Sequence, residues 1–130
     1  HVFKFCVNSH SCVNAPAQFG AIAALDGSEN HLKDMMEEFG IRRKLIFDGL
    51  RSLKGVECSL PGGSFFVFPN VKKTGMNGEE FTEKCLKEAG VAMIPGTSFG
   101  KCAMHNVRFN FATSRENISK AIEKIDKILK

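Results

Sequence analysis

The chain has 130 residues, of which 43% are hydrophobic and 25% are charged, and its formal net charge at pH 7 is +4. This composition is typical of a globular domain and argues against a disordered chain or a membrane-spanning segment. The lysines and arginines are scattered, and doublets such as Arg42-Arg43 are too short for a nucleic-acid-binding surface. We therefore expect neither a membrane nor a nucleic acid as partner.

The first third of the chain predicts an extended segment followed by two helices. Residues 1–7 alternate weakly between apolar and polar side chains, which favours an extended conformation. Asn14 as N-cap and Pro16 in the first turn indicate a helix that runs to about Leu25. Ser28 is a predicted N-cap for a longer helix, whose apolar residues recur at helical spacing until Gly55.

The middle of the chain predicts two strands and a helix. Residues 56–60 indicate a short strand, and residues 64–69, which are apolar on both faces, indicate an interior strand after a Pro-Gly-Gly turn. After a loop at 72–76, Asn77 and Glu80 form a capping-box pattern, and Gly90 is the predicted end of that helix. Its expected buried side consists of Phe81, Cys85, Leu86 and Ala89.

The last part predicts two more strands and a terminal helix. Residues 91–94 indicate a short buried strand, and residues 97–100 a glycine-bounded loop. Residues 107–113 alternate strictly, with one apolar face and one face that carries Arg108 and Asn110. Thr113 and Glu116 suggest a capping box for a helix with one apolar stripe, formed by Ile118, Ala121, Ile122, Ile125, Ile128 and Leu129.

This order of elements predicts an α+β fold. Helices should pack on one face of a small mixed or antiparallel sheet, as a two-layer sandwich. On that sheet Arg108 is the most informative residue, because a guanidinium beside the carboxamide of Asn110 suits the bidentate capture of a carboxylate or phosphate. The alternative is an arginine on a solvated strand face with ordinary surface partners.

Other chemistry finds little support in the sequence. The five cysteines are odd in number and show no C-x-x-C spacing, which indicates a reduced, cytoplasmic setting. Cys102 and His105, with His10 and Cys12 far upstream, match no tight zinc pattern, so we expect no metal site. No G-x-S-x-G, H-E-x-x-H or phosphate-binding glycine loop occurs, so a self-contained active site is not visible.

A set of short motifs, taken together in order and spacing, resembles the C-terminal part of class I/II aminotransferases, the fold-type I pyridoxal-phosphate enzymes of the aspartate aminotransferase type. The resemblance covers nearly the whole chain. The motifs are Gln18-x-x-Ala21, Arg42-Arg43, Pro61-Gly62-Gly63-Ser64-Phe65-Phe66, Ala89-Gly90-Val91, Ile94-Pro95-Gly96, Phe99-Gly100, Val107-Arg108, Ala112-Thr113 and Glu116-Asn117.

The resemblance implies specific roles. Arg108 occupies the position of the family's arginine that binds the substrate α-carboxylate, and Ser11 is the nearest match to the hydroxyl that reaches the cofactor phosphate of the neighbouring subunit. Residues 1–14 would be the tail of a large domain, and residues 15–130 the small, C-terminal domain. The full-length protein would be a homodimer that uses pyridoxal phosphate, amino acids and 2-oxo acids.

The chain also departs from the family pattern. The family's Schiff-base lysine lies in a serine-rich loop, and no lysine here has that context, so we expect this chain to be inactive alone. Residues 101–105 replace a turn that is often rich in glycine. Two alternatives stay open: another fold-type I pyridoxal-phosphate enzyme (a decarboxylase, lyase or synthase), and a freestanding α+β binding module.

Overall fold

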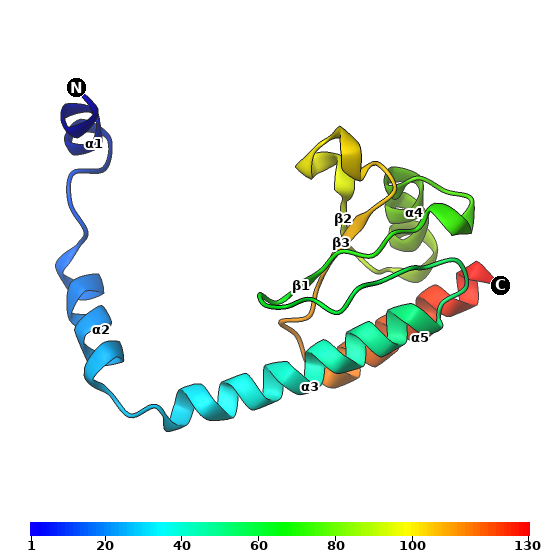
Figure 1. Ribbon diagram of the computed structural model, residues 1–130, viewed down its shortest axis with the longest axis horizontal. Coiled ribbons are helices and arrows are strands. Elements are labelled where there is room, and N and C mark those ends of the chain that lie inside the picture. Colours follow the sequence, from blue (N-terminus) through cyan, green and yellow to red (C-terminus); the bar gives the residue numbers. More distant parts are fainter. The chain divides into compact units, whose positions relative to one another are not determined.

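The structure is a computed structural model that describes residues 1–130, and its ribbon is shown in Figure 1. The chain divides into two compact units, residues 1–34 and residues 35–130. The boundary expected after residue 14 concerns the domains of a longer protein, and it stays a prediction.

The first unit contains two short helices, α1 (Val2–His10) and α2 (Ala15–Asp26). The extended segment predicted for residues 1–7 is therefore wrong. Phe3, Cys6 and Val7 also recur at the i, i+3 and i+4 positions of one helix face, and seven residues are too few to separate that pattern from alternation. The start of α2 is as predicted, since the Asn14 side-chain oxygen accepts a hydrogen bond from the Ala17 amide at 2.9 Å.

The long helix α3 (Asn30–Ser52) begins one residue later than expected, because the carbonyl of Glu29 accepts its first helical hydrogen bond, from the Lys33 amide at 3.0 Å. The Ser28 hydroxyl still accepts a hydrogen bond from the Asn30 amide at 3.3 Å. The helix buries Ile46 and Leu50 and ends three residues before Gly55. Gly55 has φ +79°, a left-handed conformation that suits glycine and turns the chain away from the helix.

Three short strands form an antiparallel sheet in the order β1-β3-β2. They are β1 (Phe66–Val67), β2 (Ile94–Pro95) and β3 (Val107–Asn110). In the register, Phe66 lies opposite Asn110 and Ile94 lies opposite Arg108. The central strand is therefore the one that carries the candidate arginine.

The sheet corrects three strand predictions. Residues 56–60 do not form a strand, and only Glu57 makes an isolated bridge, with Asn70. The expected interior strand at 64–69 is a two-residue edge strand, because β3 takes the central position and Phe68 remains 42% exposed. The expected buried strand at 91–94 is reduced to Ile94–Pro95, with Ile94 38% exposed. Apolar runs specify neither pairing order nor which face is covered.

The next helix, α4 (Gly78–Lys84), has the predicted capping box. The Glu80 carboxylate accepts a hydrogen bond from the Asn77 amide at 2.9 Å, and the Asn77 side chain accepts one from the Glu80 amide at 3.0 Å. A π-helical turn, Cys85–Ala89, continues it to Gly90 at φ +65°. Leu86, expected to be buried, is 55% exposed, because the wider π turn changes which side chains face the core.

The terminal helix α5 (Arg115–Leu129) begins one residue later than expected. Ser114 is its N-cap, with the hydroxyl accepting a hydrogen bond from the Asn117 amide at 3.2 Å, whereas Thr113 accepts one from the Asn117 side chain at 3.1 Å. The predicted apolar stripe is partly confirmed by the burial of Ile118 and Ile125. Three short 3₁₀ turns complete the chain: Lys72–Thr74, Gly96–Phe99 and Lys101–Ala103.

The core of the second unit joins the helices to one face of the sheet. Val107, Phe109 and Phe111 are 0%, 5% and 1% exposed, and they share a cluster with buried residues of α3, α4 and α5. In Figure 1, α3 and α5 run alongside each other, and Glu38 of α3 contacts Arg115 of α5. The predicted α+β fold with a small antiparallel sheet is confirmed. Arg108 lies on the face of the sheet opposite to this core.

Candidate functional site

Arg108 projects from the central strand onto the open face of the sheet. The strand predicted for residues 107–113 ends at Asn110, but the predicted alternation is confirmed by the burial of Phe109 and Phe111, while Arg108 is half-buried and Asn110 is exposed. The neighbouring strand β2 places Ile94 beside Arg108. A strand paired on both sides holds its backbone firmly, so the direction of the Arg108 side chain is set by the sheet.

Two aromatic rings flank the guanidinium group of Arg108. Its central carbon lies 4.2 Å from the centroid of the Phe66 ring and 4.7 Å from that of Phe99. No carboxylate of the chain forms an ion pair with Arg108, and its guanidinium donates no side-chain hydrogen bond. The N–H donors of a permanently charged group are therefore available to an anion.

Arg108 and Asn110 open onto the same small hollow of about 210 Å³. Its other walls are apolar, so a bound anion would be partly shielded from water and its attraction to the guanidinium would be strengthened. The lining residues are Phe66, Ala92, Met93, Ile94, Arg108 and Asn110.

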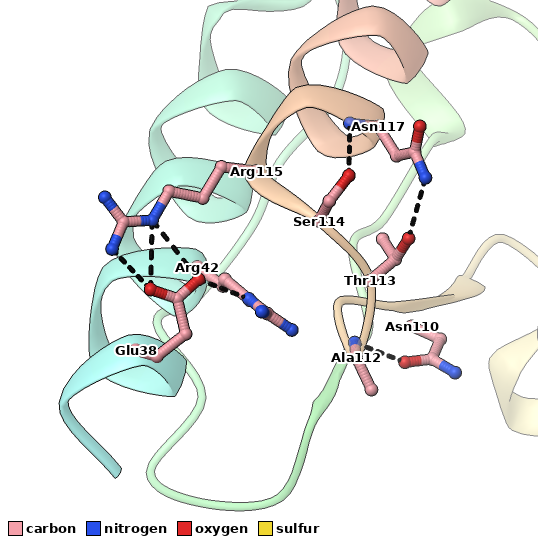
Figure 2. A network of polar contacts seen from close by, with 8 residues as sticks. All are labelled: Glu38, Arg42, Asn110, Ala112, Thr113, Ser114, Arg115 and Asn117. Carbon is pink, nitrogen blue, oxygen red and sulfur yellow. Dashed lines mark hydrogen bonds and ion pairs between the residues drawn. The ribbon is translucent and has the colours of Figure 1, made fainter. Parts of the chain in front are cut away.

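Asn110 also has a structural role, which the sequence did not reveal. Its side-chain oxygen accepts a hydrogen bond from the Ala112 amide at 2.7 Å, and this turn closes the end of β3 (Figure 2). Asparagine commonly bonds to the backbone two residues further on in this way. Only the N–H donors of the Asn110 side chain are left for a ligand, and such donors suit an anion.

A charged network lies next to the end of this strand (Figure 2). The Glu38 carboxylate accepts a hydrogen bond from Arg42 Nε at 2.7 Å, and Arg115 donates to both of its oxygens through Nε, at 3.1 and 3.2 Å, and also through Nη2. The hydrogen bonds from Arg115, and then the one from Arg42, lower the pKa of Glu38 to about 2, while the hydrogen bonds to Glu38 raise the pKa of Arg115.

The network fastens the start of α5 to α3. The pair Glu38 and Arg42 has the i, i+4 spacing that could have been read in the sequence, but Arg115 lies 77 positions from Glu38 and nothing in the sequence joins them. The guanidinium carbon of Arg42 lies 5.4 Å from the centroid of the Phe39 ring, and its side chain is 23% exposed. The Arg42-Arg43 doublet was expected to lie on the surface, but Arg42 is partly buried by these contacts.

Ser11, the predicted cofactor-binding residue, lies in the first unit and Arg108 in the second. Ser11 follows α1 with φ 58° and ψ −98°, and its amide donates to the Val7 carbonyl at 3.1 Å. Its hydroxyl forms no hydrogen bond with another residue of the chain and is exposed, so it is free to donate to a ligand.

Metal ligands, membrane-spanning helices and reactive thiols are the other candidates. No three His, Cys, Asp or Glu side chains are grouped as metal ligands, and no helix has both the length and the apolar surface needed to cross a bilayer. The five cysteines are unpaired. Burial raises the pKa values of Cys58 and Cys85 to about 11, which makes both thiols poor nucleophiles near neutral pH.

The fold and this face together define an α+β domain that presents an unpaired arginine between two aromatic rings. The family model described as aminotransferase class I and II matches residues 6–125. The chain belongs to this family, and the resemblance predicted from the motifs is confirmed.

Similar proteins support the same assignment. The chain is 39% identical over 114 residues to an aspartate aminotransferase of Pyrococcus horikoshii, a match that covers 86% of this chain and 29% of that protein. It is 39% identical over 128 residues to a probable aspartate aminotransferase of Methanocaldococcus jannaschii, a match that covers 98% of this chain and 33% of that protein. The crystal structure of an aromatic aminotransferase from Pyrococcus horikoshii has a TM-score of 0.90 at 34% identity, covering 97% of this chain and 34% of that one. The chain thus spans about a third of the length of these relatives.

Proposed function

We propose that this chain is the small-domain part of a longer pyridoxal-phosphate-dependent aminotransferase, and that Arg108 binds the α-carboxylate of the amino-acid substrate. Residues 15–130 would form the small domain and residues 1–14 the tail of the large one. The family assignment and the coverage of about a third of the relatives support this reading. The observation that carries it is a permanently charged arginine without an acidic partner on an open hollow.

Arg108 would act by orientation. A bidentate pair with a carboxylate fixes both the position and the plane of that group, which leaves the substrate few ways to turn. Asn110 would add an N–H donor from the same wall of the hollow. With the carboxylate held, the Cα–H bond is presented in one direction to a base elsewhere in the full-length protein.

The cofactor would be held mainly outside this chain. Ser11 would contribute to binding the cofactor phosphate, since its exposed hydroxyl has no partner in the chain and can donate to a phosphate oxygen. When bound, pyridoxal phosphate supplies an electron sink for the electron pair that remains when the Cα proton leaves. The Schiff-base lysine would lie in the rest of the protein, so the 130-residue chain alone should not transaminate.

We also propose that the full-length protein is a homodimer, since Ser11 would then serve the neighbouring subunit's cofactor. The cytoplasmic location is a further proposal, which rests on the odd number of cysteines. Amino acids and 2-oxo acids would be the substrates, as the names of the relatives suggest.

The proposal is tested by Arg108→Ala and Arg108→Lys in the full-length protein. Loss of a partner of a charge-assisted pair costs about 2–5 kcal/mol, so Arg108→Ala should lower kcat/KM at least about 30-fold. Lysine keeps the positive charge but lacks the paired N–H donors of the guanidinium group, so a smaller decrease in kcat/KM is expected for Arg108→Lys. L-aspartate and L-phenylalanine serve as probes, because the relatives include an aspartate and an aromatic aminotransferase. Both donors should be affected alike, since both carry the α-carboxylate.

Arg51→Ala is the matched control, because Arg51 also lies over a phenylalanine ring but does not line the hollow. Unchanged kcat/KM in Arg108→Ala would contradict the proposed role of Arg108. The product distinguishes the reaction: transfer of the amino group to a 2-oxo acid supports transamination, whereas release of carbon dioxide or cleavage of the donor would indicate another pyridoxal-phosphate reaction.

A further inference from the structure

The aromatic contacts of Arg108 differ from those of the other arginines. Arg42 and Arg51 each lie over a single ring, with 5.4 and 5.3 Å from the guanidinium carbon to the ring centroid. Arg108 has two rings at 4.2 and 4.7 Å, from Phe66 and Phe99. Arg108 thus has the closest aromatic contacts of the three, and unlike Arg42, which pairs with Glu38, it has no acidic partner.

The geometry of a guanidinium group explains why this combination matters. A cation is attracted to the face of an aromatic ring, and an arginine can stack its planar group there. Its N–H donors lie in the guanidinium plane and point outwards from its edge. Contacts made over aromatic rings therefore restrict the side chain without using up the donors that a carboxylate needs.

The two rings come from different parts of the fold, and each is itself supported. Phe66 lies on β1, opposite Asn110 in the register, and its ring packs on that of Phe65 with centroids 4.4 Å apart. Phe99 ends the 3₁₀ turn Gly96–Phe99 and packs edge-to-face on Phe68, with ring centroids 5.8 Å apart.

The turn that carries Phe99 is also fixed at its other end. A Cβ atom at Gly96 would lie 2.1 Å from the Ala103 carbonyl oxygen, and the Gly96 amide donates to the Asn106 carbonyl at 2.7 Å. The backbone of the turn therefore packs directly against the segment that leads into β3. The position of Phe99 relative to Arg108 is set by this close approach.

We propose that Phe66 and Phe99 are positioning residues, which hold the Arg108 guanidinium in the orientation that receives the substrate carboxylate. This inference rests on the proposed function of Arg108. Without a ring, the side chain would have to be ordered when substrate binds, and that cost would weaken binding. The cost of ordering the guanidinium is paid when the substrate complex forms and is shared by the ground state and the transition state, so the loss should appear in KM more than in kcat.

The test measures KM and kcat of the full-length protein with L-aspartate as donor. Phe66→Leu and Phe99→Leu should each raise KM by about two- to fivefold, which corresponds to one cation–π contact, while kcat changes less than twofold. Phe66→Tyr and Phe99→Tyr keep a ring and should restore KM. Phe47→Leu is the matched control, because it removes the ring below Arg51.

A double-mutant cycle separates positioning from a general structural effect. Phe99→Leu should have no further effect on KM when Arg108 is already alanine, because the ring then has no guanidinium to hold. An equal effect in both backgrounds, or an unchanged KM in the two leucine variants while Arg108→Ala raises KM, would overturn the inference and leave the role of Arg108 intact. An unchanged kcat/KM in Arg108→Ala itself would overturn both.

Discussion

Gly49 provides a sharp test of how α3 packs on α5. A Cβ atom at Gly49 would lie 2.8 Å from Cγ1 of Ile122, 3.2 Å from its Cδ1 and 3.3 Å from its Cγ2. Alanine in place of glycine inside a helix normally gains about 1 kcal/mol. Here the new methyl group would have to displace a β-branched side chain that has one preferred rotamer in a helix, at a cost of about 1–3 kcal/mol.

We therefore expect Gly49→Ala to lower the free energy of unfolding, or at best to leave it unchanged. In the Ile122→Ala background the obstructing atoms are gone, so the same change should raise the free energy of unfolding by about 1 kcal/mol. The difference between the two backgrounds, about 1–3 kcal/mol, is the coupling energy between the two positions.

Urea unfolding of the 130-residue chain, followed by far-ultraviolet circular dichroism, measures both effects. Gly40→Ala is the matched control, because Gly40 lies on the same helix and a Cβ atom there meets no atom within 4 Å. It should stabilise the chain by a similar amount in either background. An identical change for Gly49→Ala with and without the Ile122 side chain would refute the close approach of the helices at this point.

Two further predictions concern ionisation. The pKa of Glu38 is lowered to about 2, chiefly by hydrogen bonds from Arg115 and then by the one from Arg42. Its contribution to stability should be complete above about pH 4.5, the ordinary pKa, and should be lost as the pH falls towards 2. Glu38→Gln should lower the urea midpoint at pH 7, with little difference from the parent near pH 2; a constant difference across this range would contradict the network. Cys58 and Cys85, with pKa values raised to about 11, should react slowly with iodoacetamide at pH 8. Mass spectrometry should find earlier modification at the exposed thiols of Cys6, Cys12 and Cys102, and equal rates would contradict the burial.

Local signals accounted for most of the helices. The side chains of Asn14 and Asn77 and the glycine at 90 mark helix ends by contacts within a few residues, so they can be read without knowledge of the fold. The first helix was missed because its short apolar pattern fits two periods. The cap of α5 was displaced by one residue, from Thr113 to Ser114, because adjacent hydroxyl residues offer equivalent caps.

The strands could not be predicted from local signals in the same way. Residues 64–69 looked interior because they are apolar on both faces, yet β1 is an edge strand. Its second apolar face is explained by Phe66, which packs on the Arg108 guanidinium instead of on another layer of the core. An aromatic residue that covers a charged side chain and one that fills a core give the same pattern in the sequence.

The sequence alone was sufficient to place Arg108 on one face of β3 and the apolar residues Val107 and Phe109 on the other, because alternation is a property of the extended backbone. The surroundings of the arginine depend on how the chain folds in three dimensions. The tertiary structure placed β3 in the centre of the sheet and set a ring on each flank of the guanidinium, contributed by Phe66 and Phe99. It also left Arg108 without an acidic partner. Partners that are distant along the chain meet only when the core has formed, so no local pattern records them.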